Sequence, residues 1–148
     1  MLCKLSFAHK IIYIHSYNRI KLEMAKILVI DDMESIRQAI TNTLENEGHT
    51  VSEASNGKEG QQAIEEEDFD LIITDMFMPE KDGFDIMTFA RARNKTMPII
   101  VISGGGVALT ADWALTGAEA FASATIQKPF KSEVLIQTVN EQLAKADA

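Results

Sequence analysis

KILVIDD, residues 26 to 32, is the stretch that decides the fold of this chain. A short and nearly continuous apolar run is typical of a strand buried on both faces of a sheet, and here two acidic residues follow the run directly. Two further runs, LII at 71–73 and IIVI at 99–102, have the same apolar character. Buried strands of this kind predict a parallel sheet with helices packed on both of its faces.

Between the apolar runs, hydrophobic residues recur at helical spacing. Gly48 and the Asn56-Gly57 pair interrupt these patterns, and Pro98 precedes another run. We predict strands at 26–30, 49–54, 71–73, 99–102 and 124–127, and helices at 35–47, 58–67, 83–93, 108–116 and 131–145. A strand-helix unit repeated five times predicts an α/β fold with a five-stranded, doubly wound parallel sheet.

The composition favours one soluble domain and disfavours several classes of function. The chain has 148 residues, and 46% of them are hydrophobic. Its net charge of −8 argues against a protein that binds nucleic acid, which would need a basic face. A single cysteine, Cys3, excludes a disulfide framework, and the apolar stretch at 11–14 is far too short to span a bilayer. We therefore expect a cytoplasmic protein without a membrane partner.

Residues 1–23 differ from the rest of the chain. They contain four basic residues against one acid, Glu23, which gives +3 and leaves −11 for the remainder; the basic residues are Lys4, Lys10, Arg19 and Lys21. Two interpretations stay open. The segment is either an unstructured extension or a start assigned too early, or it is a short basic amphipathic anchor. We expect the folded domain to occupy residues 24–148.

Polar side chains follow the apolar runs at the predicted strand ends. Asp31 and Asp32 follow the first strand, Asp75 the third, Ser103 the fourth and Lys128 the fifth. The carboxyl ends of parallel strands meet at one edge, so these residues should converge there. Three converging carboxylates need a cation, and a site without His or Cys favours Mg²⁺.

A site of this composition is suited to a phosphoryl group. Phosphoryl transfer needs positioning and charge neutralisation, and a carboxylate can itself be the nucleophile, for which Asp75 is the central candidate. Each residue taken alone has a simpler explanation as a helix cap, a turn former or a surface charge. Their joint occurrence at four strand ends favours a shared site.

These motifs resemble the response-regulator receiver domain of two-component and phosphorelay signalling, in its stand-alone, chemotaxis-type form. The matching stretches are ILVIDD (27–32), ITDMFMPEKDGFD (73–85), IIVISG (99–104) and QKPF (127–130). The resemblance implies a flavodoxin-like receiver fold. It also implies that Asp75 accepts a phosphoryl group from a histidine kinase or a histidine phosphotransfer protein, in a reaction that depends on Mg²⁺.

The resemblance also assigns the other site residues. It implies that Mg²⁺ is bound directly by Asp32 and Asp75, through water by Asp31, and by the backbone carbonyl of Phe77. Ser103 would bind a phosphoryl oxygen. Lys128 would pair with Asp75 before phosphorylation and with the phosphoryl group afterwards, and the Lys128–Pro129 bond would be cis.

One switch position departs from the family pattern. Relatives often carry Tyr or Phe three residues before the motif lysine, where this chain has Thr125. We therefore expect the glycine-rich loop after Ser103, which begins with Gly104 and Gly105, to carry more of the switch. Gly104 would leave room for the donor, and Phe121 is expected to be a packing residue.

The expected function is a single-domain phosphoacceptor switch with self-phosphorylation and autodephosphorylation chemistry, not an enzyme in the usual sense. Its downstream protein target would bind the face formed by the predicted elements at 108–116, 124–127 and 131–145. Two alternatives stay open. One is a pseudo-receiver that only binds proteins. The other is a nucleotide binder that uses the glycine loop, although the chain lacks G-x-G-x-x-G after its first strand and a Walker lysine.

Overall fold

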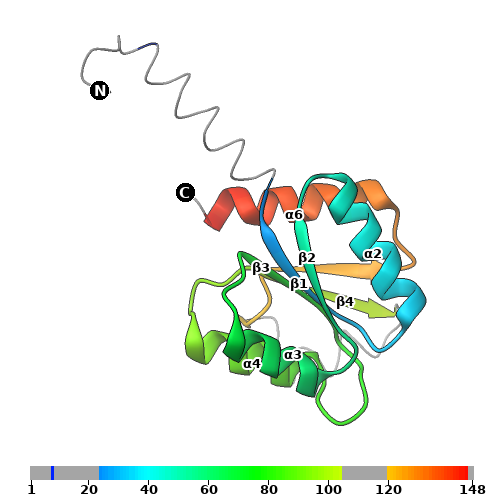
Figure 1. Ribbon diagram of the computed structural model, residues 1–148, viewed down its shortest axis with the longest axis vertical. Coiled ribbons are helices and arrows are strands. Elements are labelled where there is room, and N and C mark those ends of the chain that lie inside the picture. Colours follow the sequence, from blue (N-terminus) through cyan, green and yellow to red (C-terminus); the bar gives the residue numbers. More distant parts are fainter. Residues whose placement is uncertain (1–7, 9–23, 105–119, 147–148) are drawn as a thin grey trace.

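The computed structural model describes residues 8, 24–104 and 120–146 (Figure 1). Five parallel strands form one sheet in the order β2-β1-β3-β4-β5. Their bounds are β1 Lys26–Ile30, β2 Thr50–Ala54, β3 Leu71–Asp75, β4 Ile99–Gly104 and β5 Ala124–Lys128. The strand order changes direction between β1 and β3, which is where ligands bind in flavodoxin-like sheets.

Helices cover both faces of the sheet. In the described residues they are α2 Glu34–Asn46, α3 Gly57–Glu66, α4 Gly83–Arg93 and α6 Ser132–Ala146. Helices α2 and α6 lie on one face, and α3 and α4 lie on the other (Figure 1). The α/β doubly wound prediction is confirmed. The helix predicted at 108–116, Gly105 and nearly all of the leading segment lie outside the described residues, and the domain bounds stay a prediction.

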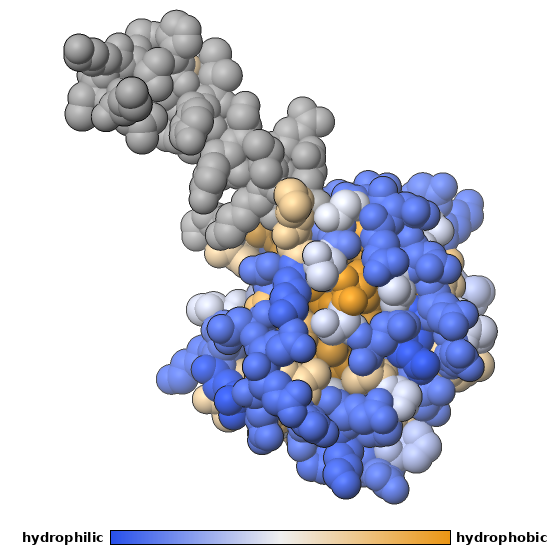
Figure 2. All heavy atoms as spheres, viewed as in Figure 1, coloured by the Kyte–Doolittle hydropathy of each residue, from blue (hydrophilic) through white to orange (hydrophobic). Residues whose placement is uncertain are grey.

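Side chains alternate between the two faces along each strand, and each set is buried. Leu28, Ile30 and Ile72 pack beneath α3 and α4. Ile27, Val29 and Ile73 pack beneath α2 and α6. Because both faces are covered, a strand needs apolar residues at every position, which explains the continuous runs in the sequence. Figure 2 shows polar side chains over most of this view and apolar ones at its centre, where the β2 edge lies between α2 and α3.

Capping side chains and a glycine mark where several helices begin or end. The Asn56 side chain accepts a hydrogen bond from the Glu59 N–H at 2.9 Å and caps α3. Asp82 and Asp85 form a reciprocal capping box at the start of α4. Gly48 follows α2 with a φ of 93°, a left-handed conformation that favours glycine. Within the described part of the chain, no helix is long and apolar enough to cross a membrane.

Phe121 is a packing residue, as predicted. Its ring meets Phe84 edge to face, with the ring centroids 5.8 Å apart. Its carbonyl accepts hydrogen bonds from Arg91 Nε at 3.1 Å and from a terminal nitrogen of Arg91 at 2.7 Å. Arg91 also donates to the carbonyls of Lys95 and Met97 and so ties α4 to the segments before both β4 and β5.

His49 is a buried titratable residue at the amino edge of the sheet. It is 6% exposed, and its Nδ1 accepts a hydrogen bond from the Ala25 N–H at 3.3 Å. Burial lowers the pKa of His49 below its ordinary value of 6.5, although the Glu47 charge opposes the shift. The unfolded chain therefore binds a proton at this site more readily than the folded chain does.

We predict that folding stability falls as the pH drops below about 6.5, because protonation favours the unfolded state and removes the Nδ1 acceptor. In His49→Asn, an amide oxygen can accept from Ala25 without titrating. Urea unfolding from about pH 8 to about pH 5.5 should show a smaller loss of stability in the variant than in the parent. Equal losses would assign the acid sensitivity to other groups.

Candidate functional site

The register of the sheet brings the predicted site residues to one edge. Ile30 pairs with Thr74 across β1 and β3, and Asp75 pairs with Ile102 across β3 and β4. Ser103 and Gly104 pair with Gln127 and Lys128 across β4 and β5. The strand ends are thus level, and the polar residues there become neighbours despite separations of up to 97 positions.

Three carboxylates form a cluster at this edge. Asp31, Asp32 and Asp75 each offer an oxygen, and these oxygens lie within 4.8 Å of one another. Asp31 is 1% exposed and Asp75 is 7% exposed, whereas Asp32 faces solvent. A cluster of oxygen donors that is open on one side fits a hard divalent cation that retains water, so these residues fit Mg²⁺.

Lys128 supplies the positive charge that the cluster needs. Its ammonium lies 3.1 Å from Asp75 Oδ2 and 3.2 Å from Asp31 Oδ2. Burial raises the pKa of Asp75, and the hydrogen bond and charge of Lys128 oppose that shift. Burial lowers the pKa of Lys128, but the bonds and charges of Asp75 and Asp31 outweigh it and leave this pKa raised. Sequence reasoning paired Lys128 with Asp75 alone and missed Asp31.

Both buried carboxylates are oriented by a backbone N–H two residues farther along the chain. Asp31 Oδ1 accepts from Met33 at 2.8 Å, and Asp75 Oδ1 accepts from Phe77 at 3.4 Å. This is the Asx-turn arrangement typical of aspartate. Helix α2 begins after Met33 without a side-chain cap, so neither Asp31 nor Asp32 caps it. Arg37 donates to the Asp31 carbonyl at 2.8 Å, a contact that the sequence did not reveal.

The remaining predicted residues lie around this cluster. Ser103 is buried at the end of β4, while Gly104, Thr125 and Pro129 are exposed. The Lys128–Pro129 bond is cis, as expected. Phe77 is 54% exposed beside the acceptor, and the role of its carbonyl as a metal ligand stays a prediction. A Cβ built on Gly104 would meet no atom within 4 Å, which agrees with open space above the site.

The segment after Asp75 is held from two sides. Lys81 donates to Gln61 Oε1 at 2.5 Å, and its backbone packs so closely on Gly57 that a Cβ there would overlap it. A Cβ on Gly83 would lie 2.7 Å from the Asp75 carbonyl oxygen and 2.9 Å from Met76 Cα. Gly57 therefore allows α3 to approach the segment after the acceptor, and Gly83 allows α4 to approach the end of the acceptor strand. The resemblance to the receiver family implies that Gly83 shapes this segment, whereas the sequence contains no sign of the role of Gly57.

The fold and the acidic edge define a flavodoxin-like domain with a cluster of three carboxylates at the carboxyl ends of its strands, and comparison with known proteins agrees on the fold. The family model for the response regulator receiver domain matches residues 27–140. The transcriptional regulatory protein CusR of Escherichia coli strain K12 is 32% identical over 123 residues, or 83% of this chain and 53% of CusR. The chain thus spans about half the length of such curated relatives.

Solved structures give the same result at the level of the domain. A receiver domain protein from Clostridium thermocellum is 33% identical with a TM-score of 0.74, and the match covers 83% of this chain and 97% of that one. A CheY-like receiver domain protein from Methanospirillum hungatei JF-1 is 28% identical with a TM-score of 0.75, over 84% of this chain and 97% of that one. The chain belongs to the response regulator receiver domain family.

We predict that Gly83→Ala destabilises the domain by about 1–3 kcal/mol, because the added methyl group has no space beside the acceptor strand. Gly104→Ala is the matched control, because its methyl group enters open space and should stabilise by no more than about 1 kcal/mol. Chemical denaturation of both variants measures the difference. Equal midpoints for the two variants would contradict the close approach at Gly83.

Proposed function

We propose that Asp75 accepts a phosphoryl group from a histidine kinase or a histidine phosphotransfer protein, in a reaction that requires Mg²⁺. One observation carries the proposal. The Asp75 carboxylate lies at a strand end, within 4.8 Å of two other carboxylates and 3.1 Å from an ammonium group. Membership of the receiver family supports a histidine kinase as the source of the phosphoryl group.

In the proposed step, a carboxylate oxygen of Asp75 attacks the phosphorus of phosphohistidine. An O–P bond forms while the N–P bond breaks, and its electron pair leaves with the donor imidazole. The Lys128 ammonium is 3.1 Å from Asp75 Oδ2 and is placed to stabilise charge on a phosphoryl oxygen. The Ser103 hydroxyl would donate to another.

Asp31, Asp32, Asp75 and the Phe77 carbonyl would hold the metal ion. When bound, Mg²⁺ neutralises phosphoryl oxygens together with the carboxylates around them. Before phosphorylation, Lys128 shares its charge between Asp31 and Asp75. After it, the ammonium would face a group with more negative charge than a carboxylate, so we expect it to shift toward the phosphoryl oxygens.

The signal would leave through the protein surface beside β5. Ser103 and Gly104 pair with the last residues of β5, so a movement at Ser103 reaches that strand directly. We propose that a downstream protein binds the face formed by the 108–116 segment, β5 and α6, the first of which lies outside the described residues. Thr125 is exposed on β5 and has no aromatic ring that could turn on phosphorylation. The proposed switch therefore depends more on the loop at 104–105.

We further propose that the domain acts as a stand-alone cytoplasmic regulator that binds no nucleic acid. The net charge of −8 and the match to nearly the whole length of a CheY-like protein support this form. CusR, whose name describes a transcriptional regulator, is about twice as long as the matched region. An immunoblot of the native protein tests the proposal: a band near 16.4 kDa supports it, and a band of about twice that mass contradicts it.

We predict that acetyl phosphate and Mg²⁺ add one phosphoryl group to the parent chain and none to Asp75→Ala, because the nucleophile is lost. Intact-mass measurement gives the readout. Asp68→Asn, which removes an exposed carboxylate far from the cluster, is the control and should label normally. Labelling of Asp75→Ala would refute the assignment, and no labelling of the parent would favour the pseudo-receiver alternative.

We also predict that Asp32→Asn weakens Mg²⁺ binding at least tenfold, about 1.4 kcal/mol, because a charged oxygen ligand becomes neutral. Glu34→Gln removes the same charge two residues farther on and should change the affinity much less. Calorimetric titration of the unphosphorylated proteins measures both. Equal effects would mean that Asp32 acts only through long-range charge.

A further inference from the structure

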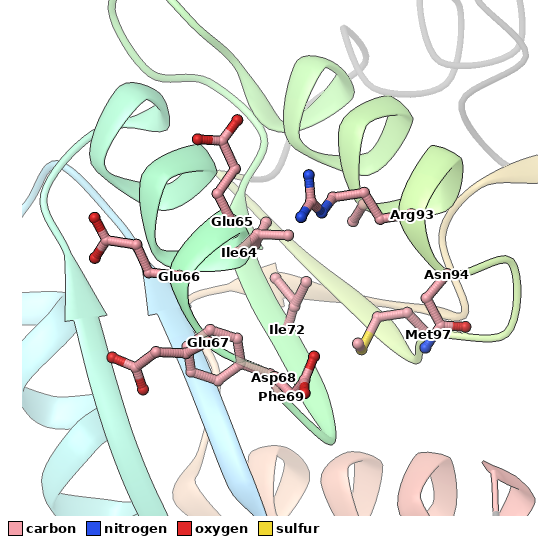
Figure 3. A pocket seen from close by; sticks show the side chains of 11 residues that line it. Ile64, Glu65, Glu66, Glu67, Asp68, Phe69, Ile72, Arg93, Asn94 and Met97 are labelled. Atoms are coloured by element: carbon pink, nitrogen blue, oxygen red, sulfur yellow. The ribbon is translucent and has the colours of Figure 1, made fainter.

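A groove of about 670 Å³ lies between the carboxyl ends of α3 and α4, away from the acidic edge (Figure 3). Its floor is apolar and is formed by Phe69, Ile72 and Ala90, with Met97 at one side. Acidic residues 65–68 lie along its rim; Figure 3 shows the Glu66 and Glu67 carboxylates directed away from the cavity and Arg93 extending across the mouth from α4. We call this feature the α3–α4 groove.

The rim already binds one ammonium group of the same chain. Lys26, the first residue of β1, forms an ion pair with Glu67, and its Nζ lies 5.3 Å from the centroid of the Phe69 ring. Its backbone N–H also donates to Asp70 Oδ2 at 2.8 Å. Lys26 does not itself line the groove, but its contacts show that Phe69 and Glu67 at the groove's edge accept a lysine side chain.

Negative charge remains on the rim after this pairing. Within the described part of the chain, the contact of the Glu66 carboxylate is an amide hydrogen bond from Gln62 at 2.8 Å. Among the described residues, neither Glu65 nor Asp68 forms an ion pair. An apolar floor beneath these carboxylates suits a segment that has both basic and apolar side chains.

We propose that the α3–α4 groove docks the chain's own leading segment, residues 1–23. That segment has a net charge of +3 and is rich in Ile, Leu and Tyr, whereas the rest of the chain carries −11. It joins the domain at Met24, two residues before the lysine that contacts the rim. Arg19 and Lys21 precede Lys26 by seven and five residues, and seven extended residues reach about 24 Å.

Docking there leaves the phosphoacceptor site open. The groove lies at the amino end of β3, next to Phe69, and Asp75 lies at the carboxyl end of the same strand. The leading segment would cover the apolar floor without approaching the carboxylate cluster. The proposal does not depend on the phosphoryl chemistry of Asp75.

The test uses the full chain with one nitroxide label. The natural Cys3 is replaced by Ser, and Ser16→Cys places the label three residues before Arg19. We expect the nitroxide to cause loss of amide NMR intensity at Asp68, Arg93 and Asn94, and no loss at Asp32 and Gly104 on the opposite edge. Intact groove signals, or equal losses at both edges, would overturn the proposal.

Two charge variants distinguish docking from general attraction. Glu65→Lys with Asp68→Lys should abolish the intensity loss, whereas Glu45→Lys with Glu141→Lys, which changes the net charge equally, should retain it. Abolition by both pairs, or by neither, contradicts a specific groove. A mixture of labelled chains and unlabelled ¹⁵N chains must show no loss at the groove, because loss there would identify a second copy as the occupant.

Discussion

Two buried carboxylates, Asp31 and Asp75, share a single ammonium group, that of Lys128, at distances of 3.2 and 3.1 Å. Burying either carboxylate without a partner would be costly, and removing the ammonium would leave two like charges together. The strands must therefore end level with one another, because Lys128 reaches both acids only in this register. The shared ammonium group therefore sets both the position of the site and the alignment of β1, β3 and β5.

The same arrangement would allow the proposed phosphoryl group on Asp75 to act as a switch. The charge of Lys128 is divided between two acids, so a more negative group on Asp75 changes where that charge is best placed. Burial raises the pKa of Asp75, which makes its charged form dependent on nearby cations. The proposed response to a phosphoryl group would therefore begin with a shift of the Lys128 ammonium.

The opposite edge of the sheet has a different character. There the α3–α4 groove combines an apolar floor with an acidic rim, and Lys26 ties β1 to that rim. Strand β3 joins the two regions, since it begins beside Phe69 and ends at Asp75. Contacts of α3 with Lys81 also link the groove side of the molecule to the segment after the acceptor.

The sequence by itself determined the fold class and most of the site. Continuous apolar runs at 26–30 and 99–102 require burial on both faces, and the residues after each run fall at one edge because parallel strands share a direction.

Tertiary structure decided the features that need contacts between residues far apart in the chain. Strand β3 extends to Asp75, beyond its apolar run, because β4 pairs with Thr74 and Asp75. The bond from Lys128 to Asp31 and the close packing at Gly57 and Gly83 join segments that have no local signal for one another. The groove likewise depends on tertiary structure, because side chains from α3, β3 and α4 together form its walls.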